Sequence, residues 1–151
     1  MDDSQRTFFM TTVTWQRVPI FRKEARARLL IDVLLDYRDQ GKYLLHEFVI
    51  MPDHLHALLT PAAEISVERA VQFIKGGYSY RLRKVEKIQV WQESFTNHRV
   101  RDFDDYQRHC EYVRLNPVRA LGARSGVVCV FVGWCGVSVG FNATGAEAPL
   151  P

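Results

Sequence analysis

The 151-residue chain contains little cysteine, and its Cys110, Cys129 and Cys135 include no pair at Cys-x-x-Cys spacing. These thiols do not predict a disulfide framework, and we expect them to be reduced. The sequence also lacks a Gly-rich phosphate-binding loop. Its first residues are acidic and polar where a secretory signal needs a basic start and an apolar run. We therefore expect a cytoplasmic protein.

Charged residues are scarce beyond Leu121, where only Arg124 and Glu147 occur. Residues 127–137 are apolar, but the run is too short and too interrupted by glycine for a membrane-spanning helix. An extra strand, a dimer contact and a poorly folded tail are alternatives that the sequence leaves open. The length suits one domain with a real core, so we expect a domain over residues 1–120 and a divergent tail over residues 121–151.

Positive charge is concentrated in the first part of the chain, although the formal net charge is only +3. The residues at 22–28 and 75–87 place arginines and lysines on predicted helices, as in a nucleic-acid-binding surface or a solvated helix face. Residues around one helix cannot all face one strand, so we expect only some to touch DNA. The candidates are Lys75, Arg81, Arg83 and Lys84 for phosphates, and Tyr78 and Tyr80 for stacking on unpaired bases.

Strand and helix patterns alternate over the first 120 residues. β-Branched and aromatic residues predict the strands, and apolar residues at helical spacing predict the helices, with Gly41 as one helix stop and Ser66 as one N-cap. Gly76-Gly77 predicts a bend or a close backbone approach inside a helix. We expect a strand at 7–15, a helix at 23–39, strands at 43–51 and 54–60, a helix at 66–85, an extended segment at 91–101, and a helix from 104 to Leu115 or Asn116, before Pro117.

The resulting β-α-β-β-α-β-α order predicts the fold class. It resembles a split-βαβ, ferredoxin-like α+β sandwich, in which an antiparallel sheet carries helices on one face.

Two histidines separated by one apolar residue, His54-Leu55-His56, begin the second strand of a predicted hairpin. This spacing places both imidazoles on one face of a strand, where neutral ring nitrogens can bind one divalent ion. Such an ion favours phosphate chemistry, because it polarises a phosphoryl oxygen. The alternative is a structural or merely exposed histidine pair.

The last predicted helix carries a second chemical element. Arg108, Tyr112 and Asn116 follow one another at intervals of four residues, so they lie along one helical stripe. This stripe can present a cation, a nucleophile and a ligand together. A tyrosine hydroxyl needs a metal or base nearby to act as a nucleophile, and the alternative is a packed aromatic residue.

These residues together resemble a family. Met51-Pro52-Asp53-His54-Leu55-His56, followed by the segment from Tyr112 to Ala120, is similar to the REP-associated tyrosine transposases of the single-tyrosine HUH superfamily. The likeness covers roughly residues 6 to 120, and residues 7–15 and 90–95 also fit the family. After Ala120 the chain departs from the family's pattern.

The resemblance implies metal-dependent cleavage and rejoining of single-stranded DNA near a hairpin through a phosphotyrosine intermediate. His54, His56 and Asn116 match the ligands of Mg²⁺ or Mn²⁺, and Tyr112 matches the nucleophile. Arg108 and Arg114 join the DNA-contact candidates. The family also leads us to expect a homodimer.

Two other functions are alternatives for this sequence. A histidine phosphohydrolase fits poorly, because Leu58 stands where a third alternating histidine would be and no second His-x-Thr motif is present. A catalytically silent DNA-binding module derived from a transposase is the alternative that the sequence leaves open. His98 and His109 are interpreted as ordinary polar residues, with further ligation or proton transfer as the alternative.

Overall fold

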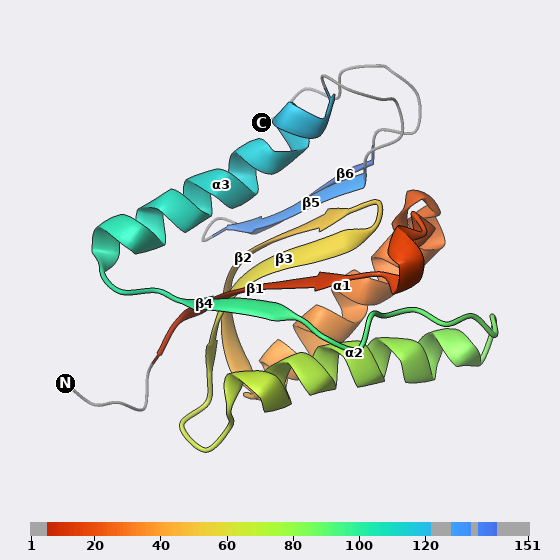
Figure 1. Ribbon diagram of the computed structural model, residues 1–151, viewed down its shortest axis with the longest axis horizontal. Helices are drawn as coiled ribbons and strands as arrows, with labels where there is room; N and C mark the ends of the chain where they lie inside the picture. Colours follow the sequence, from red (N-terminus) through yellow and green to blue (C-terminus); the bar gives the residue numbers. More distant parts are fainter. Residues whose placement is uncertain (1–5, 122–127, 134–135, 142–151) are drawn as a thin grey trace.

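A computed structural model describes residues 6–121, 128–133 and 136–141 of the chain (Figure 1). Its principal elements are β1 (Phe8–Val13), α1 (Glu24–Asp39), β2 (Tyr43–Met51), β3 (His54–Pro61), α2 (Val67–Arg83), β4 (Thr96–Arg99), α3 (Phe103–Leu121), β5 (Val128–Gly133) and β6 (Gly136–Phe141). Two short 3₁₀ turns, Trp15–Arg17 and Ile20–Arg22, connect β1 to α1. The predicted order of strands and helices is therefore confirmed through α3.

The first four strands form an antiparallel sheet in the order β2-β3-β1-β4. This is the strand order of the predicted ferredoxin-like, split-βαβ fold, and the α+β fold class is confirmed. The central strands β1 and β3 pair along their whole length, from Phe8 opposite Leu59 to Val13 opposite His54. The histidine pair therefore lies on an interior strand of the sheet, with a paired neighbour on each side.

The sheet separates two layers of side chains (Figure 1). Helices α1 and α2 cover one face, where Met10, Phe48 and Leu55 belong to the main apolar core. Alternate strand residues point to the opposite face, because side chains alternate along a strand. There Phe9 and Val49 pack with Met51 and with Val113 of α3. Helix α3, which follows the sandwich proper, thus covers the face that carries His54 and His56.

Local sequence signals explain where the two core helices end or bend. Ser66 caps α2 by accepting a hydrogen bond from the backbone N–H of Arg69 at 3.1 Å. Gly41 follows α1 with a φ of +75°, a conformation that glycine adopts without strain. Gly77 marks a close approach: a Cβ at this position would lie 2.6 Å from Cε2 of Tyr37 on α1.

Helix α3 differs from the expectation at its C-terminal end. The prediction that it stops at Leu115 or Asn116 is wrong, because α3 continues through Pro117 to Leu121. The proline ring fixes φ at about −65°, which is a helical value, so proline removes one hydrogen bond and crowds the preceding turn without forbidding a helix.

The tail region contains a hairpin in its described part. Strands β5 and β6 pair in antiparallel register, from Val128 opposite Phe141 to Gly133 opposite Gly136. They form a separate two-stranded sheet, and β5 lies alongside β2 (Figure 1). Of the alternatives for this region, the extra strand is the one observed. Within the part of the chain that is described, no helix combines the length and apolarity needed to cross a membrane.

Candidate functional site

The turn formed by Pro52 and Asp53 connects β2 to β3, so His54 begins β3 as the sequence predicts. In the sheet register, His54 lies opposite Met51 of β2, and His56 lies opposite Thr11 of β1. The two imidazole rings share the face covered by α3, and their centroids are 4.6 Å apart. The His-x-His spacing therefore brings two ring systems together on rigid β-structure.

Each histidine is oriented through its Nδ1 atom. His54 Nδ1 lies 2.7 Å from Oδ1 of Asp53, and His56 Nδ1 lies 2.7 Å from the hydroxyl of Thr11. A carboxylate can only accept, so the His54 Nδ1–H donates, and Nε2 is the ring nitrogen that a metal ion would use. This arrangement resembles the outer shell of metal-bound histidines, in which one ring nitrogen is fixed and the other binds the ion.

The electrostatics of His56 also suit a ligand. Its side chain is 7% exposed, and burial, followed by the nearby His54, lowers the pKa of His56 to about 4. The ring is therefore neutral at neutral pH, as metal binding requires. Two oriented imidazoles fit a divalent ion.

Tyr112 of α3 lies against the same histidine. Its ring centroid is 5.5 Å from that of His56 and 5.8 Å from that of Phe9, both in edge-on contacts. Tyr112 is 41% exposed, so the residue is accessible from solvent. Asn116 is partly buried one helical turn further along α3. The sheet and α3 thus bring together the tyrosine and the histidines that lie more than fifty residues apart in the sequence.

The two predicted DNA contacts of α3 differ in their surroundings. Arg108 is exposed, and its Nε lies 3.4 Å from the carbonyl of Asp104. Arg114 binds the buried carboxylate of Glu47 on β2, with Nε 3.1 Å from Oε1. The Arg114 side chain is still 60% exposed. Arg114 therefore connects α3 to the sheet while more than half of its side chain stays exposed.

Two of the DNA-contact candidates on α2 have structural roles. Tyr78 is fully buried and donates its hydroxyl to the carbonyl of Arg26 at 3.0 Å, so the prediction that it stacks on a base is corrected. Lys75 donates to the carbonyls of Gln92 and Glu93, at 2.6 and 3.2 Å. Its ammonium thereby holds the segment that leads into β4. The sequence did not separate these inward residues from outward ones.

The other α2 candidates lie on the far layer from His54 and His56. Arg81 pairs with Asp36 of α1 at 2.7 Å, and Lys84 lies over the exposed ring of Tyr80 at 4.7 Å. Arg83 is exposed at the end of the helix. Because α2 and α3 cover opposite faces of the sheet, these residues and Tyr112 do not form one surface (Figure 1).

Sequence reasoning missed several residues that shape the site. Phe9 contacts His56, His109 and Tyr112, and Thr11 fixes His56. The alternation of side chains along β1 places Phe9 and Thr11 on the same face of the sheet. The sequence of that strand does not show that this face also carries His54 and His56. Arg17 was also missed: it lies 3.4 Å from Asp53 and has a φ of +53°, unusual for a non-glycine residue.

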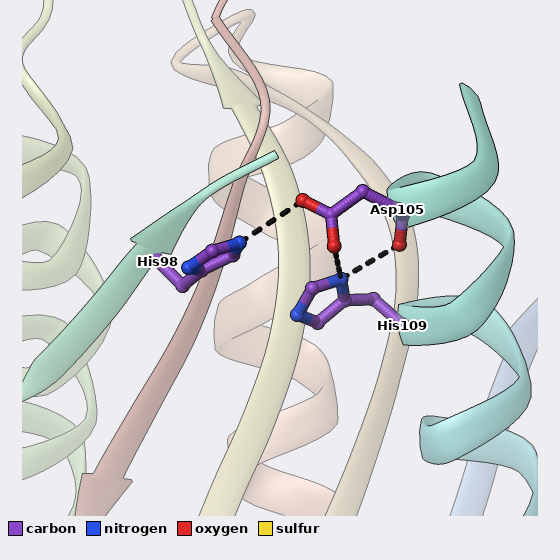
Figure 2. A group of neighbouring side chains, drawn as sticks. All are labelled: His98, Asp105 and His109. Carbon is purple, nitrogen blue, oxygen red and sulfur yellow. Dashed lines mark hydrogen bonds and ion pairs between the residues drawn. The ribbon is translucent and has the colours of Figure 1, made fainter. Parts of the chain in front are cut away.

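A further polar cluster joins β4 to α3. His98 Nε2 lies 3.0 Å from Oδ2 of Asp105, and His109 Nδ1 lies 2.8 Å from the backbone carbonyl of Asp105 (Figure 2). The two imidazole rings stack with centroids 5.0 Å apart. The described residues thus include a His/Asp group with the donor types and spacing of a metal site. The interpretation of both histidines as ordinary polar residues overlooked this convergence.

Fold and site together define a transposase-type domain, and comparison with known families agrees. The model of the family described as Transposase IS200 like matches residues 5–115, so the chain belongs to that family. Among curated proteins, it is similar to the REP-associated tyrosine transposase of Escherichia coli K12. The two are 23% identical over 93 residues, which are 61% of this chain and 54% of that protein. The resemblance identified from the two motifs is therefore confirmed.

Two further matches support the same assignment. An uncharacterised protein of Haemophilus influenzae KW20 Rd is 24% identical over 127 residues, covering 69% of this chain and 61% of that protein. A solved REP-associated tyrosine transposase bound to a REP hairpin has the same fold, with a TM-score of 0.67 and 21% identity. That match covers 80% of this chain and 71% of the other. The chain therefore spans only about half to three fifths of these curated relatives.

Proposed function

We propose that this protein cleaves and rejoins single-stranded DNA at hairpin elements, with Tyr112 as the nucleophile. The observation that carries the proposal is that Tyr112 lies beside the oriented pair His54 and His56. The centroids of the Tyr112 and His56 rings are 5.5 Å apart. Family membership and the hairpin-bound relative support the class of substrate. A homodimer stays a prediction.

The donor set fits a divalent ion of the Mg²⁺ or Mn²⁺ class. His54 and His56 would supply Nε2 atoms, and the amide oxygen of Asn116 would supply a third ligand from the turn after Tyr112. When bound, such an ion polarises the scissile phosphate. Asp53 and Thr11 keep the two rings turned toward it.

The chain's own chemistry then follows from Tyr112. The Tyr112 hydroxyl gives up its proton to solvent as its oxygen attacks phosphorus in line, a P–O bond to Tyr112 forms, and the bond to the 3′-oxygen breaks. The 3′-oxygen takes up a proton, which leaves a 5′-phosphotyrosine and a free 3′-hydroxyl. Because the new bond is also a phosphodiester, a 3′-hydroxyl can attack it in the reverse direction and rejoin the DNA without ATP.

Two exposed arginines on α3 are placed to assist DNA binding near Tyr112. Arg108 lies one turn before the tyrosine on the same stripe, and the side chain of Arg114 is 60% exposed. Tyr80, Arg83 and Lys84 on α2 would contact a strand only where the DNA extends to the other layer of the molecule. The bases of an unpaired segment can stack on Tyr80, which is 65% exposed.

Denaturing gel analysis with a labelled single-stranded hairpin and Mn²⁺ tests the proposal. We expect a slowly migrating covalent species with the natural chain and none with Tyr112→Phe. Tyr106→Phe is the matched control, because Tyr106 belongs to the same helix but contacts His46 rather than the histidine pair. Binding of the hairpin without an adduct would overturn the catalytic proposal and favour the silent DNA-binding module.

A further inference from the structure

A second group of metal-type donors lies apart from His54 and His56. His98 comes from β4, whereas Asp105 and His109 are one turn apart on α3, and the three side chains converge (Figure 2). One donor atom from each lies within 4.8 Å of the other two. We propose that His98, Asp105 and His109 bind a divalent first-row transition ion, such as Zn²⁺, which fastens β4 to the helix that carries Tyr112.

The separations between the donor atoms suit a shared ion. His98 Nε2 is 3.0 Å from Oδ2 of Asp105, and His109 Nδ1 is 3.4 Å from Oδ1. Two donors that each lie about 2.1 Å from one ion, in octahedral or tetrahedral geometry, are roughly 3.0–3.4 Å apart. The Asp105 carboxylate therefore lies at ligand spacing from both imidazoles, through Oδ2 toward His98 and through Oδ1 toward His109.

Asp105 provides the negative charge. Its side chain is 7% exposed, and hydrogen bonds from His98 and from the backbone N–H of Arg101 lower the pKa of its carboxyl to about 2. A buried, ionised carboxylate requires a compensating charge or donors. The guanidinium of Arg101 approaches Oδ2 only to 3.7 Å, and its side chain is 72% exposed. An ion between the imidazoles would supply positive charge directly at the carboxylate.

The two imidazoles can become ligands by a change of tautomer. In the metal-free arrangement, His98 donates to the Asp105 carboxylate and His109 Nδ1–H donates to the Asp105 backbone carbonyl. A neutral imidazole carries one proton, and when that proton lies on the other nitrogen of the ring, the nitrogen that faces Asp105 has a lone pair for the ion.

The donor types select the class of ion, and the surroundings separate this cluster from the first pair. Two imidazoles and one carboxylate suit Zn²⁺ or Co²⁺ better than Mg²⁺, which prefers oxygen ligands. The His98 side chain is 46% exposed, which provides a path for the ion to enter.

The cluster is separated from the His54 and His56 pair by one strand. Phe9 contacts both His56 and His109, and its strand β1 lies between β3 and β4. The cluster is thus a separate site across one strand.

Zinc titration calorimetry of the 151-residue chain, after chelator treatment, tests this site. The starting protein carries His54→Ala and His56→Ala, so that the histidine pair of the proposed catalytic site makes no contribution. We expect this protein to bind one Zn²⁺, and the further substitution His98→Ala to weaken binding by at least about tenfold, since a ligand is lost. Absence of zinc binding by the starting protein, or unchanged affinity after His98→Ala, would overturn the proposal.

Two further variants make the result specific. His46→Ala removes the remaining histidine of the chain, which contacts Thr60 and Tyr106 outside the cluster, and should leave zinc affinity unchanged. Asp105→Asn keeps the size of the side chain but removes its charge, and should weaken binding as His98→Ala does. Circular dichroism establishes that each variant is folded. The assignment would be contradicted if His46→Ala weakened zinc binding as much as His98→Ala does, or if Asp105→Asn kept the full zinc affinity. The outcome is independent of DNA cleavage.

Discussion

His54 and His56 acquire their chemical character from the residues that hold their Nδ1 atoms. The Asp53 carboxylate fixes one ring and the Thr11 hydroxyl fixes the other, each at 2.7 Å. Without these partners the two rings would be free to rotate, and their Nε2 atoms would not be held in position for one ion. At this scale, Thr11 is a positioning residue for the proposed ion.

Replacement of Thr11 by valine tests this role. Valine keeps the branched shape but cannot hydrogen-bond His56. We therefore expect adduct formation to need an Mn²⁺ concentration about 10–100-fold higher, as is typical when an outer-shell partner of a metal ligand is lost. The measurement is adduct yield against Mn²⁺ concentration, with thermal unfolding as a check on folding.

Thr12→Val is the matched control for that substitution. Thr12 is the next residue of β1, points to the opposite face, and its buried hydroxyl has no hydrogen-bond partner among the described residues. We expect the Mn²⁺ dependence to be unchanged. Similar losses in the two variants would show that the strand, rather than the Thr11 hydroxyl, matters.

Helices α1 and α2 pack closely because α2 has a glycine, Gly77, where it meets Tyr37 of α1. The Tyr37 ring is itself held by stacking on Phe73, with centroids 5.2 Å apart. A side chain at Gly77 would meet this ring, whereas one at Gly76 would meet nothing within 4 Å. Packing against Tyr37 therefore requires glycine at position 77 but not at position 76.

The two alanine substitutions should have opposite effects on the free energy of unfolding. Gly77→Ala places a methyl against the Tyr37 ring, and overpacking of this kind costs about 1–3 kcal/mol. Gly76→Ala should stabilise the protein by about 0.4–1 kcal/mol, because alanine has less freedom to lose in a helix. Urea denaturation of both variants measures the difference. Equal effects would contradict the close contact.

The elements also show what the sequence could and could not predict. Alternating residues around Phe9 and His54 predicted the strands, and Ser66 and Gly41 predicted helix ends, because these signals are local. The Pro117 signal was misleading, because the φ that proline imposes is a helical value and α3 continues through it. Tyr78 was assigned to DNA because a helix pattern alone does not say which neighbouring layer its aromatic residues face.

The convergence of distant residues was the least predictable part of the site. His98 and His109 looked unrelated in the sequence, since only the pairing of β4 with β1 places His98 opposite Phe9 and beside α3. Recognition of the His54 and Tyr112 motifs required a family resemblance, whereas their contact required the fold. The prediction of a domain over residues 1–120 and a tail over 121–151 stays a prediction.

For the molecule as a whole, the sheet divides the cationic residues between two surfaces. Arg108 and Arg114 belong to the α3 layer with Tyr112, and Arg83 and Lys84 belong to the α2 layer (Figure 1). A hairpin positioned for attack by Tyr112 must approach the α3 layer. The proposed function therefore predicts unequal roles for arginines that the sequence alone treats alike.

Comparison of Arg108→Ala with Arg83→Ala tests this division. We expect Arg108→Ala to weaken hairpin binding and to reduce the slope of log affinity against log salt by about 1, as for loss of one phosphate contact. Arg83→Ala should change neither quantity. Fluorescence anisotropy over a range of salt concentrations measures both, and a larger effect from Arg83→Ala would place the DNA on the other layer.

The central claim is that Tyr112 becomes joined to DNA, and mass spectrometry of the trapped adduct tests it most directly. Trypsin cleaves after arginine, so Tyr112 lies in the peptide 109–114 and Tyr106 in the peptide 102–108. If Tyr112 is the nucleophile, a nucleotide phosphate remains on the peptide 109–114 after nuclease digestion and is absent from Tyr112→Phe. A nucleotide on the peptide 102–108, or no modified peptide when the hairpin is bound with Mn²⁺, would contradict it.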